Sequence, residues 1–143
     1  MLALIGHWEN AVEIAKNPHA TKKLLGRWSL TAKAFGIKNV ILVDVEKTQP
    51  FIGDAEIDFE VYPNLDAVYR AYPDEKYVYI EKGGKPLKEF EHPKEALYVL
   101  GGDYSGMVIP KGATVVSIDS KISLYAEIAA GIVLHDRQVK LGS

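Results

Sequence analysis

The chain has 143 residues, of which 48% are hydrophobic and 25% are charged, and its formal net charge is −2. This is the composition of an ordinary globular domain, and it excludes a long disordered chain and a uniformly basic nucleic-acid coat protein. Cysteine is absent and the four histidines show no metal-ligand spacing, so we expect neither disulfides nor a metal. No apolar run approaches the roughly 20 residues of a membrane span, and we expect one cytoplasmic domain over residues 1–143.

Apolar runs rich in β-branched residues alternate with helical patterns along the chain. This alternation is typical of βαβ units and indicates an α/β fold with a mainly parallel six-stranded sheet flanked by helices. We see no internal repeat and no linker that would divide the chain. The predicted strands are Leu2–Gly6, Asn39–Val43, Asp58–Tyr62, Lys76–Ile80, Ala96–Leu100 and Thr114–Ile118.

Two helices are predicted between these strands. The first begins at Asn17-Pro18, has apolar residues at helical spacing and ends at Gly36, which directly precedes the second strand. The second is short, with Asn64 as its N-cap and Pro73 as its stop.

A third helix is predicted from Lys121 to about Val139, and it is the longest helical pattern of the chain. Small residues between Ala126 and Gly131 would let another helix approach it closely. Its predicted apolar stripe consists of Ile122, Tyr125, Ala129, Ile132 and Val133.

The charges are unevenly distributed along the chain. Between Ile14 and Val43 there are six basic residues and no acidic one, whereas the stretch from Asp44 to Glu75 holds nine acidic residues against two basic ones. A basic face of this kind attracts phosphate groups, but lysines on a solvated helix need no partner. Both interpretations remain open.

The most informative segment follows the fifth predicted strand. The strand runs directly into Leu100-Gly101-Gly102-Asp103, and Gly106 follows closely. Glycine permits positive φ and close backbone approach, so such a turn at the carboxyl end of a parallel strand is a common place for a ligand. The spacing is neither that of a P-loop nor that of a dinucleotide fingerprint. On spacing alone, a structural turn and a ligand site both remain open.

A second glycine segment, Glu81-Lys82-Gly83-Gly84-Lys85, follows the fourth predicted strand. If the sheet is parallel, both glycine segments leave it at the same edge. Taken alone, the second segment also fits a simple exposed turn.

Two segments of the C-terminal half carry a family pattern. Gly101–Met107 follows a strand and precedes another, and Ser123–Glu127 opens a long Ala-rich helix. Their sequence and order resemble the SpoU-like branch of the SPOUT superfamily of RNA methyltransferases. Asp103 stands in place of that family's Glu, and Tyr125 stands in place of its Asn.

The N-terminal half resembles the same family. Thr31–Gly36, followed by the strand that ends at Val43, matches the family's Thr-Ala-x-Ala-Phe-Gly and its next strand. Leu30 stands where the family has an arginine. Arg27 lies one helical turn earlier on the same face.

The resemblance implies a trefoil knot formed by the C-terminal part of the sheet, S-adenosylmethionine as cofactor and RNA, either tRNA or rRNA, as substrate. It also implies that backbone groups of three loops hold the cofactor. Carried over to this chain, the cofactor-binding residues are Glu81, Lys82, Gly83, Leu100, Gly101, Gly102, Ile118, Ser123 and Leu124.

Catalytic roles also follow from the resemblance. In SpoU-like relatives the arginine of the first motif is implicated in activating a ribose 2′-hydroxyl. Leu30 cannot do this, so Arg27 is the predicted replacement, with Asp103 orienting it and Ser123 or Tyr125 contacting the substrate. A surface arginine, an aspartate that stabilises its own turn and a packed tyrosine are the alternatives at three of these positions.

The resemblance further implies a homodimer packed through the C-terminal helix, with Lys22, Lys23 and Arg27 as candidate RNA contacts. Two other functions remain open. A catalytically inactive cofactor- or RNA-binding relative is favoured by Leu30 and Tyr125 at positions where the family keeps functional residues. An unrelated flavodoxin-like nucleotide-binding domain would be indicated by an unknotted sheet.

Overall fold

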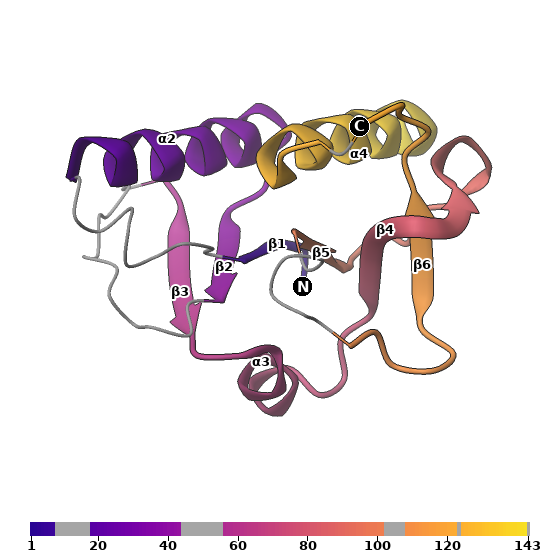
Figure 1. Cartoon of the computed structure of the whole chain (residues 1–143), viewed down its shortest axis with the longest axis horizontal. Coiled ribbons are helices and arrows are strands. Elements are labelled where there is room, and N and C mark those ends of the chain that lie inside the picture. The colour runs from indigo at the N-terminus through magenta and orange to yellow at the C-terminus, as the bar shows by residue number, and fades with distance from the viewer. Residues whose placement is uncertain (8–17, 44–55, 102–107, 123, 143) are drawn as a thin grey trace.

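The computed structural model describes residues 1–7, 18–43, 56–101, 108–122 and 124–142. In this part of the chain six strands form a single sheet (Figure 1). They are β1 (Ala3–His7), β2 (Asn39–Val43), β3 (Asp58–Tyr62), β4 (Tyr77–Pro86), β5 (Leu97–Leu100) and β6 (Thr114–Ser117). The strand order is β3-β2-β1-β5-β4-β6, and all neighbouring pairs are parallel. The predicted six-stranded parallel α/β fold is therefore confirmed.

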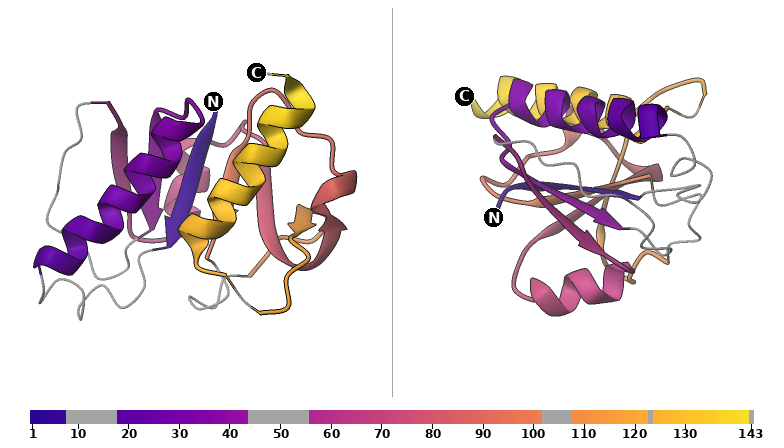
Figure 2. Two further views of the ribbon diagram at one scale, coloured as in Figure 1. Left: turned by 90° about the horizontal axis from the view of Figure 1, so that it is seen from above. Right: turned by 90° about the vertical axis from the view of Figure 1, so that its left-hand side faces the viewer.

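Helices cover both faces of this sheet. The long helices α2 (Pro18–Ala34) and α4 (Ala126–Leu141) lie side by side on one face, and the short α3 (Leu65–Ala71) packs on the other (Figures 1 and 2). A single 3₁₀ turn, η1 (Leu87–Glu89), follows β4. The arrangement is the three-layer architecture that βαβ units produce.

The predicted helix boundaries hold for α2 and α3. Gly36 has a φ of 71°, and the amide of Ile37 bonds back to the carbonyl of Ala32 at 2.9 Å, which ends α2 in the expected way. The side chain of Asn64 accepts a hydrogen bond from the amide of Ala67 at 2.8 Å and so caps α3.

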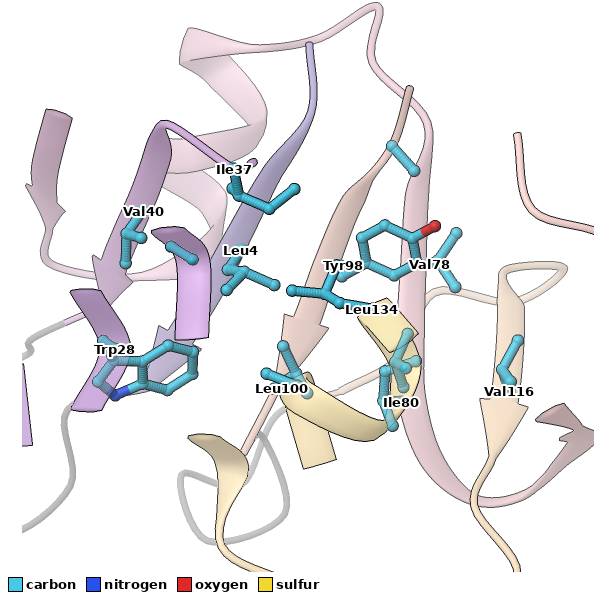
Figure 3. Close-up of a cluster of buried hydrophobic side chains, with 14 of the residues drawn as sticks. Leu4, Trp28, Ile37, Val40, Val78, Ile80, Tyr98, Leu100, Val116 and Leu134 are labelled. Atoms are coloured by element: carbon cyan, nitrogen blue, oxygen red, sulfur yellow. The ribbon is translucent and has the colours of Figure 1, made fainter. Parts of the chain in front are cut away.

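The core lies in two layers, one on each face of the sheet. Between the sheet and the two long helices, Leu4, Trp28, Tyr98 and Leu134 are at most 2% exposed (Figure 3). A second cluster under α3 includes Val68 together with the opposite faces of β1, β2 and β5. Because β5 is covered on both faces, all four of its residues are buried, which explains its uninterrupted apolar sequence.

Helix α4 begins later than the sequence predicts. The predicted start was Lys121, but the first helical residue is Ala126, and Tyr125 has extended backbone angles as the N-cap. The Ser120 hydroxyl donates to the carbonyl of Ile122 at 2.8 Å, which keeps this segment in a turn. Ile122 and Tyr125 are each 75% exposed, so they do not belong to the buried stripe that the sequence predicted. The buried residues of α4 are Ala130, Val133 and Leu134.

Strand β4 continues beyond its predicted end at Ile80. Ile80 and Lys85 both pair with Val116 of β6, so the four residues between them are an insertion within the strand. The predicted glycine turn is therefore an irregularity inside β4, because pairing with β6 resumes after it.

The predicted trefoil knot depends on the path of the chain between β5 and β6. Residues 102–107 of this connection lie outside the described residues. The knot stays a prediction.

Candidate functional site

The three segments predicted to hold a cofactor come from three neighbouring strands. Strand β4 lies between β5 and β6, and the three strands run in the same direction. Glu81–Gly84 interrupts β4, Gly101 follows β5, and Ile118 follows β6. Carboxyl ends of parallel strands are where α/β proteins commonly bind ligands. The fold therefore places on three neighbouring strands segments that are well separated in sequence.

The turn after β5 is held against the start of α4. Gly101 has a φ of 75°, a conformation that L side chains rarely adopt. A Cβ placed on Gly101 would lie 3.1 Å from the Cβ of Ala126, the first residue of α4. Leu100, immediately before the turn, is buried. Glycine at position 101 thus allows both the turn and the close approach of the helix.

The insertion in β4 lies directly against the backbone of β6 at Gly84. Gly83 has a φ of 80° and open space around it, whereas a Cβ on Gly84 would lie 2.6 Å from the backbone carbon and oxygen of Val115. The Ser117 hydroxyl donates to the carbonyl of Gly84 at 3.1 Å. Lys82 is exposed and Glu81 is half-buried, so their backbone is presented near the surface.

The third predicted segment, after β6, is irregular up to the start of α4. Ile118 and Leu124 are half-buried, and Ile118 packs against the core under α2 and α4. Gly102, Asp103 and Ser123, three further predicted site residues, lie outside the described residues. Their predicted roles are untested.

Arg27 of α2 forms an ion pair with a residue of the neighbouring helix α4. Its Nε donates to Oε1 of Glu127 at 3.0 Å, and the two side chains are 55% and 12% exposed, respectively. Glu127 directly follows Ala126, so Arg27 is linked to the helix end that touches the Gly101 turn. The sequence interpretation did not identify Glu127 as a partner of Arg27, because the two residues are 100 positions apart.

Beside this ion pair is an open, mainly apolar groove of about 600 Å³ between α2 and α4. Leu30, which stands where the resemblance expects arginine, is 68% exposed and lines it. Ile128 and Ile132 of α4 are 48% and 39% exposed and line it as well.

The predicted substrate and RNA contacts are only partly brought together. Tyr125 is exposed at the N-terminal end of α4, on the same end as the Gly101 turn. Lys22 and Lys23 lie in the N-terminal half of α2, in the same helix as Arg27.

Sequence reasoning missed His7, the last residue of β1. Its Nδ1 lies 2.9 Å from the carbonyl oxygen of Leu100, the last residue of β5. Burial lowers the pKa of His7, and the hydrogen bond to Leu100 opposes this shift. A histidine directly after the predicted strand Leu2–Gly6 was the signal, because the carboxyl ends of parallel strands carry ligand-binding residues.

Among the described residues there is no group of three or more histidine, aspartate or glutamate side chains that could hold a metal ion. Within the same part of the chain, no helix combines the length and the apolar composition needed to cross a bilayer.

No protein-family model matches the chain, and no curated protein matches it in sequence. Solved structures do match its fold. A protein from Porphyromonas gingivalis assigned to the TrmH family of RNA methyltransferases matches with a TM-score of 0.62 and 19% identity over 95% of this chain, which spans only 58% of that protein. A structure described in terms of 2′-OH methylation of C/U34 on tRNA matches with a TM-score of 0.67 and 13% identity over 99% of this chain and 97% of its own.

A third match is the SpoU methyltransferase AviRb from Streptomyces viridochromogenes, in complex with S-adenosylmethionine. Its TM-score is 0.60 at 14% identity, over 100% of this chain and 62% of AviRb. The structural neighbours are thus RNA methyltransferases of the TrmH and SpoU type. The chain has the fold of these enzymes.

Proposed function

We propose that the protein is an S-adenosylmethionine-dependent RNA methyltransferase, a divergent SpoU-like member of the SPOUT superfamily with one knotted domain over residues 1–143. The observation that carries the proposal is the arrangement of the β4, β5 and β6 segments. They come from three neighbouring parallel strands of a sheet whose fold is shared with known RNA methyltransferases. A cytoplasmic location fits an enzyme that acts on tRNA or rRNA.

The three segments suit a cofactor held mainly by backbone groups. Gly83 and Gly101 have positive φ, and because they lack a side chain a ligand can approach their backbone amides and carbonyls closely. The residues that would hold S-adenosylmethionine are those around Gly83, Leu100–Gly102 and Ile118–Leu124. The AviRb complex with this cofactor supports the assignment. When bound, S-adenosylmethionine supplies a methyl group activated by a sulfonium.

The acceptor proposed is a ribose 2′-hydroxyl of RNA. Support comes from the neighbour concerned with 2′-OH methylation of C/U34 on tRNA. The basic α2 would contact phosphates through Lys22 and Lys23. Arg27 would add a fixed positive charge near the substrate, because Glu127 holds it at the end of α4 that touches the Gly101 turn.

A homodimer is proposed through the groove between α2 and α4. A second copy would bury the exposed side chains of Leu30, Ile128 and Ile132. Each Å² of apolar surface removed from water in this way stabilises the dimer by about 25 cal/mol. Ile128→Lys should shift the protein toward a monomer in sedimentation velocity, whereas Val139→Lys, an equally apolar position outside the groove, should not. Equal sedimentation of both variants and the wild type would contradict this interface.

The first experiment is calorimetric titration of S-adenosylmethionine and S-adenosylhomocysteine into the protein and into Gly101→Val. Gly101 has a φ of 75°, so valine there strains the turn as well as the proposed site. Gly112→Val is the matched control, because Gly112 has a φ of 81° in a turn outside the three segments. We expect micromolar binding that Gly101→Val abolishes and Gly112→Val retains. Absence of binding at millimolar cofactor would refute the proposal.

A second function is a cofactor- or RNA-binding protein without catalysis. It is favoured by Leu30, an exposed apolar side chain at the position of the family's arginine, and by the pairing of Arg27 with Glu127. Cofactor binding without methyl transfer to unmodified tRNA or rRNA would support this function over the first.

A further inference from the structure

His7 lies where the strand order of the sheet reverses. From β1 the chain builds β2 and β3 on one side, while β5, β4 and β6 lie on the other side. Gly6 of β1 pairs with Leu100 of β5, and His7 pairs with Val43 of β2. Ligands of open parallel sheets bind outside the carboxyl ends at such a reversal. His7 is therefore at this position, beside the turn that Gly101 forms.

The hydrogen bond of His7 fixes which ring nitrogen carries the proton. A carbonyl oxygen only accepts, so the contact of 2.9 Å between Nδ1 and the Leu100 carbonyl requires a proton on Nδ1. In the neutral ring, Nε2 then carries a lone pair. Among the described residues, the structure gives Nε2 no hydrogen-bond partner. The ring is half-buried, so Nε2 is an oriented acceptor beside the carboxyl ends of the strands.

The surroundings of His7 favour the neutral ring. Burial is the main cause that lowers its pKa, and the Leu100 hydrogen bond raises it by less. Within the described residues, His7 pairs with Val43 of β2 and contacts the carbonyl of Leu100 of β5. Neither residue is charged. His7 is consequently a base and not a cation at neutral pH.

Neither Leu30 nor its predicted replacement Arg27 can accept a proton. Leu30 has no titratable group, and the guanidinium of Arg27 stays protonated in proteins and already donates to Glu127. Hydroxyl methylation nevertheless releases a proton, which a base near neutral pKa removes most effectively.

We propose that His7 accepts the proton of the RNA hydroxyl in the reaction put forward under Proposed function, on which this role rests. The hydroxyl oxygen forms a bond to the methyl carbon as the bond from carbon to sulfur breaks. The sulfonium becomes the neutral thioether S-adenosylhomocysteine, and the hydroxyl proton moves to Nε2 of His7. The Leu100 carbonyl stabilises the resulting imidazolium through the Nδ1 proton.

One test needs no activity. Long-range ¹H–¹⁵N spectra of the protein should show His7 in the Nδ1–H tautomer, and its ring should titrate below its ordinary pKa of 6.5. Addition of S-adenosylhomocysteine should shift its resonances, because the ring lies beside the Gly101 turn. An Nε2–H tautomer, or resonances unmoved by the bound cofactor product, would overturn the proposal.

The second test separates catalysis from structure with two variants. His7→Asn keeps an N–H donor near the position of Nδ1 but lacks the basic Nε2, and His7→Phe lacks both. Methyl transfer from labelled S-adenosylmethionine to unmodified tRNA and rRNA transcripts should fall roughly 10²- to 10⁴-fold in His7→Asn. Its cofactor affinity should stay within about twofold. The loss of rate at acid pH that we expect of the wild type should be absent in this variant.

The outcomes distinguish the two proposals. A wild-type protein that binds no cofactor, or binds it without methylating either RNA, refutes the methyltransferase and with it this role. A wild-type protein that methylates RNA while His7→Asn keeps its rate and pH profile refutes the role of His7 alone. Recovery of the His7→Asn rate by added imidazole would support it.

Discussion

Replacing Gly84 with alanine is expected to destabilise the sheet at the edge where the proposed cofactor segments emerge. A Cβ at this position would lie 2.6 Å from the backbone carbon and oxygen of Val115 and 2.7 Å from its Cγ1. A side chain can rotate away from such a contact, but the backbone of β6 cannot. The insertion in β4 would therefore have to move away from β6.

The cost has two parts. Overpacking in a well-packed region costs about 1–3 kcal/mol. Separation of the two strands also breaks the hydrogen bond of 3.1 Å from the Ser117 hydroxyl to the Gly84 carbonyl, which contributes about 0.5–1.5 kcal/mol. Together they predict a loss of about 2–4 kcal/mol in the free energy of unfolding, against a total of about 5–15 kcal/mol for a domain.

Urea unfolding followed by circular dichroism measures this loss. With a slope of about 2 kcal/mol per M, the midpoint of Gly84→Ala should fall by about 1–2 M. Gly26→Ala is the matched control, because Gly26 lies in α2 with open space around it. That substitution should stabilise the protein by about 0.5–1 kcal/mol. An unchanged midpoint for Gly84→Ala would refute the close approach of β4 and β6.

Three further predictions concern stability. Burial lowers the pKa of His7 and of His92, so the unfolded chain takes up protons at a higher pH than the folded protein does. The free energy of unfolding should therefore decrease as pH falls below 6.5, and the urea midpoint should be lower at pH 5.5 than at pH 7.5. The opposite order would contradict the burial of both rings. Tyr98→Phe removes the hydroxyl that lies 2.8 Å from Nδ1 of the buried His92, and it should lower the free energy of unfolding by about 1–3 kcal/mol in the same assay. An unchanged free energy of unfolding would indicate that water replaces the hydroxyl. Leu134→Ala, which empties a core position that is 1% exposed, should lower the free energy of unfolding by about 2–5 kcal/mol, whereas the exposed Val139→Ala should change it little.

The strands were predictable because their sequence signal is local. Buried strands such as Leu97–Leu100 are continuous apolar runs, and β2 and β3 have the predicted bounds. The start of α4 was wrong by five residues because Ile122 and Tyr125 continue the helical spacing of apolar residues. Spacing alone does not reveal that both side chains are exposed and that a hydroxyl of Ser120 holds the preceding turn.

The sequence predicted only those features of the candidate site whose residues are neighbours along the chain. The Gly101 turn was identified from its glycines, and its positive φ confirms the special backbone that they imply. The partner of Arg27 and the contact of His7 with Leu100 both join residues more than 90 positions apart. Such contacts depend on the order of strands in the sheet, which a single sequence does not contain.

The position of β5 has a consequence for how the protein reaches its folded state. Leu97 pairs with Ala3 on one side and with Tyr77 on the other, and Val99 likewise pairs with both Ile5 and Tyr79. The first three strands can associate soon after synthesis, but β4 has no neighbour in the sheet until β5 or β6 has been made. Closing these distant pairings makes folding slow relative to domains with local contacts. A nascent chain that has just completed β4 therefore displays an unpaired apolar strand to the ribosome and its chaperones.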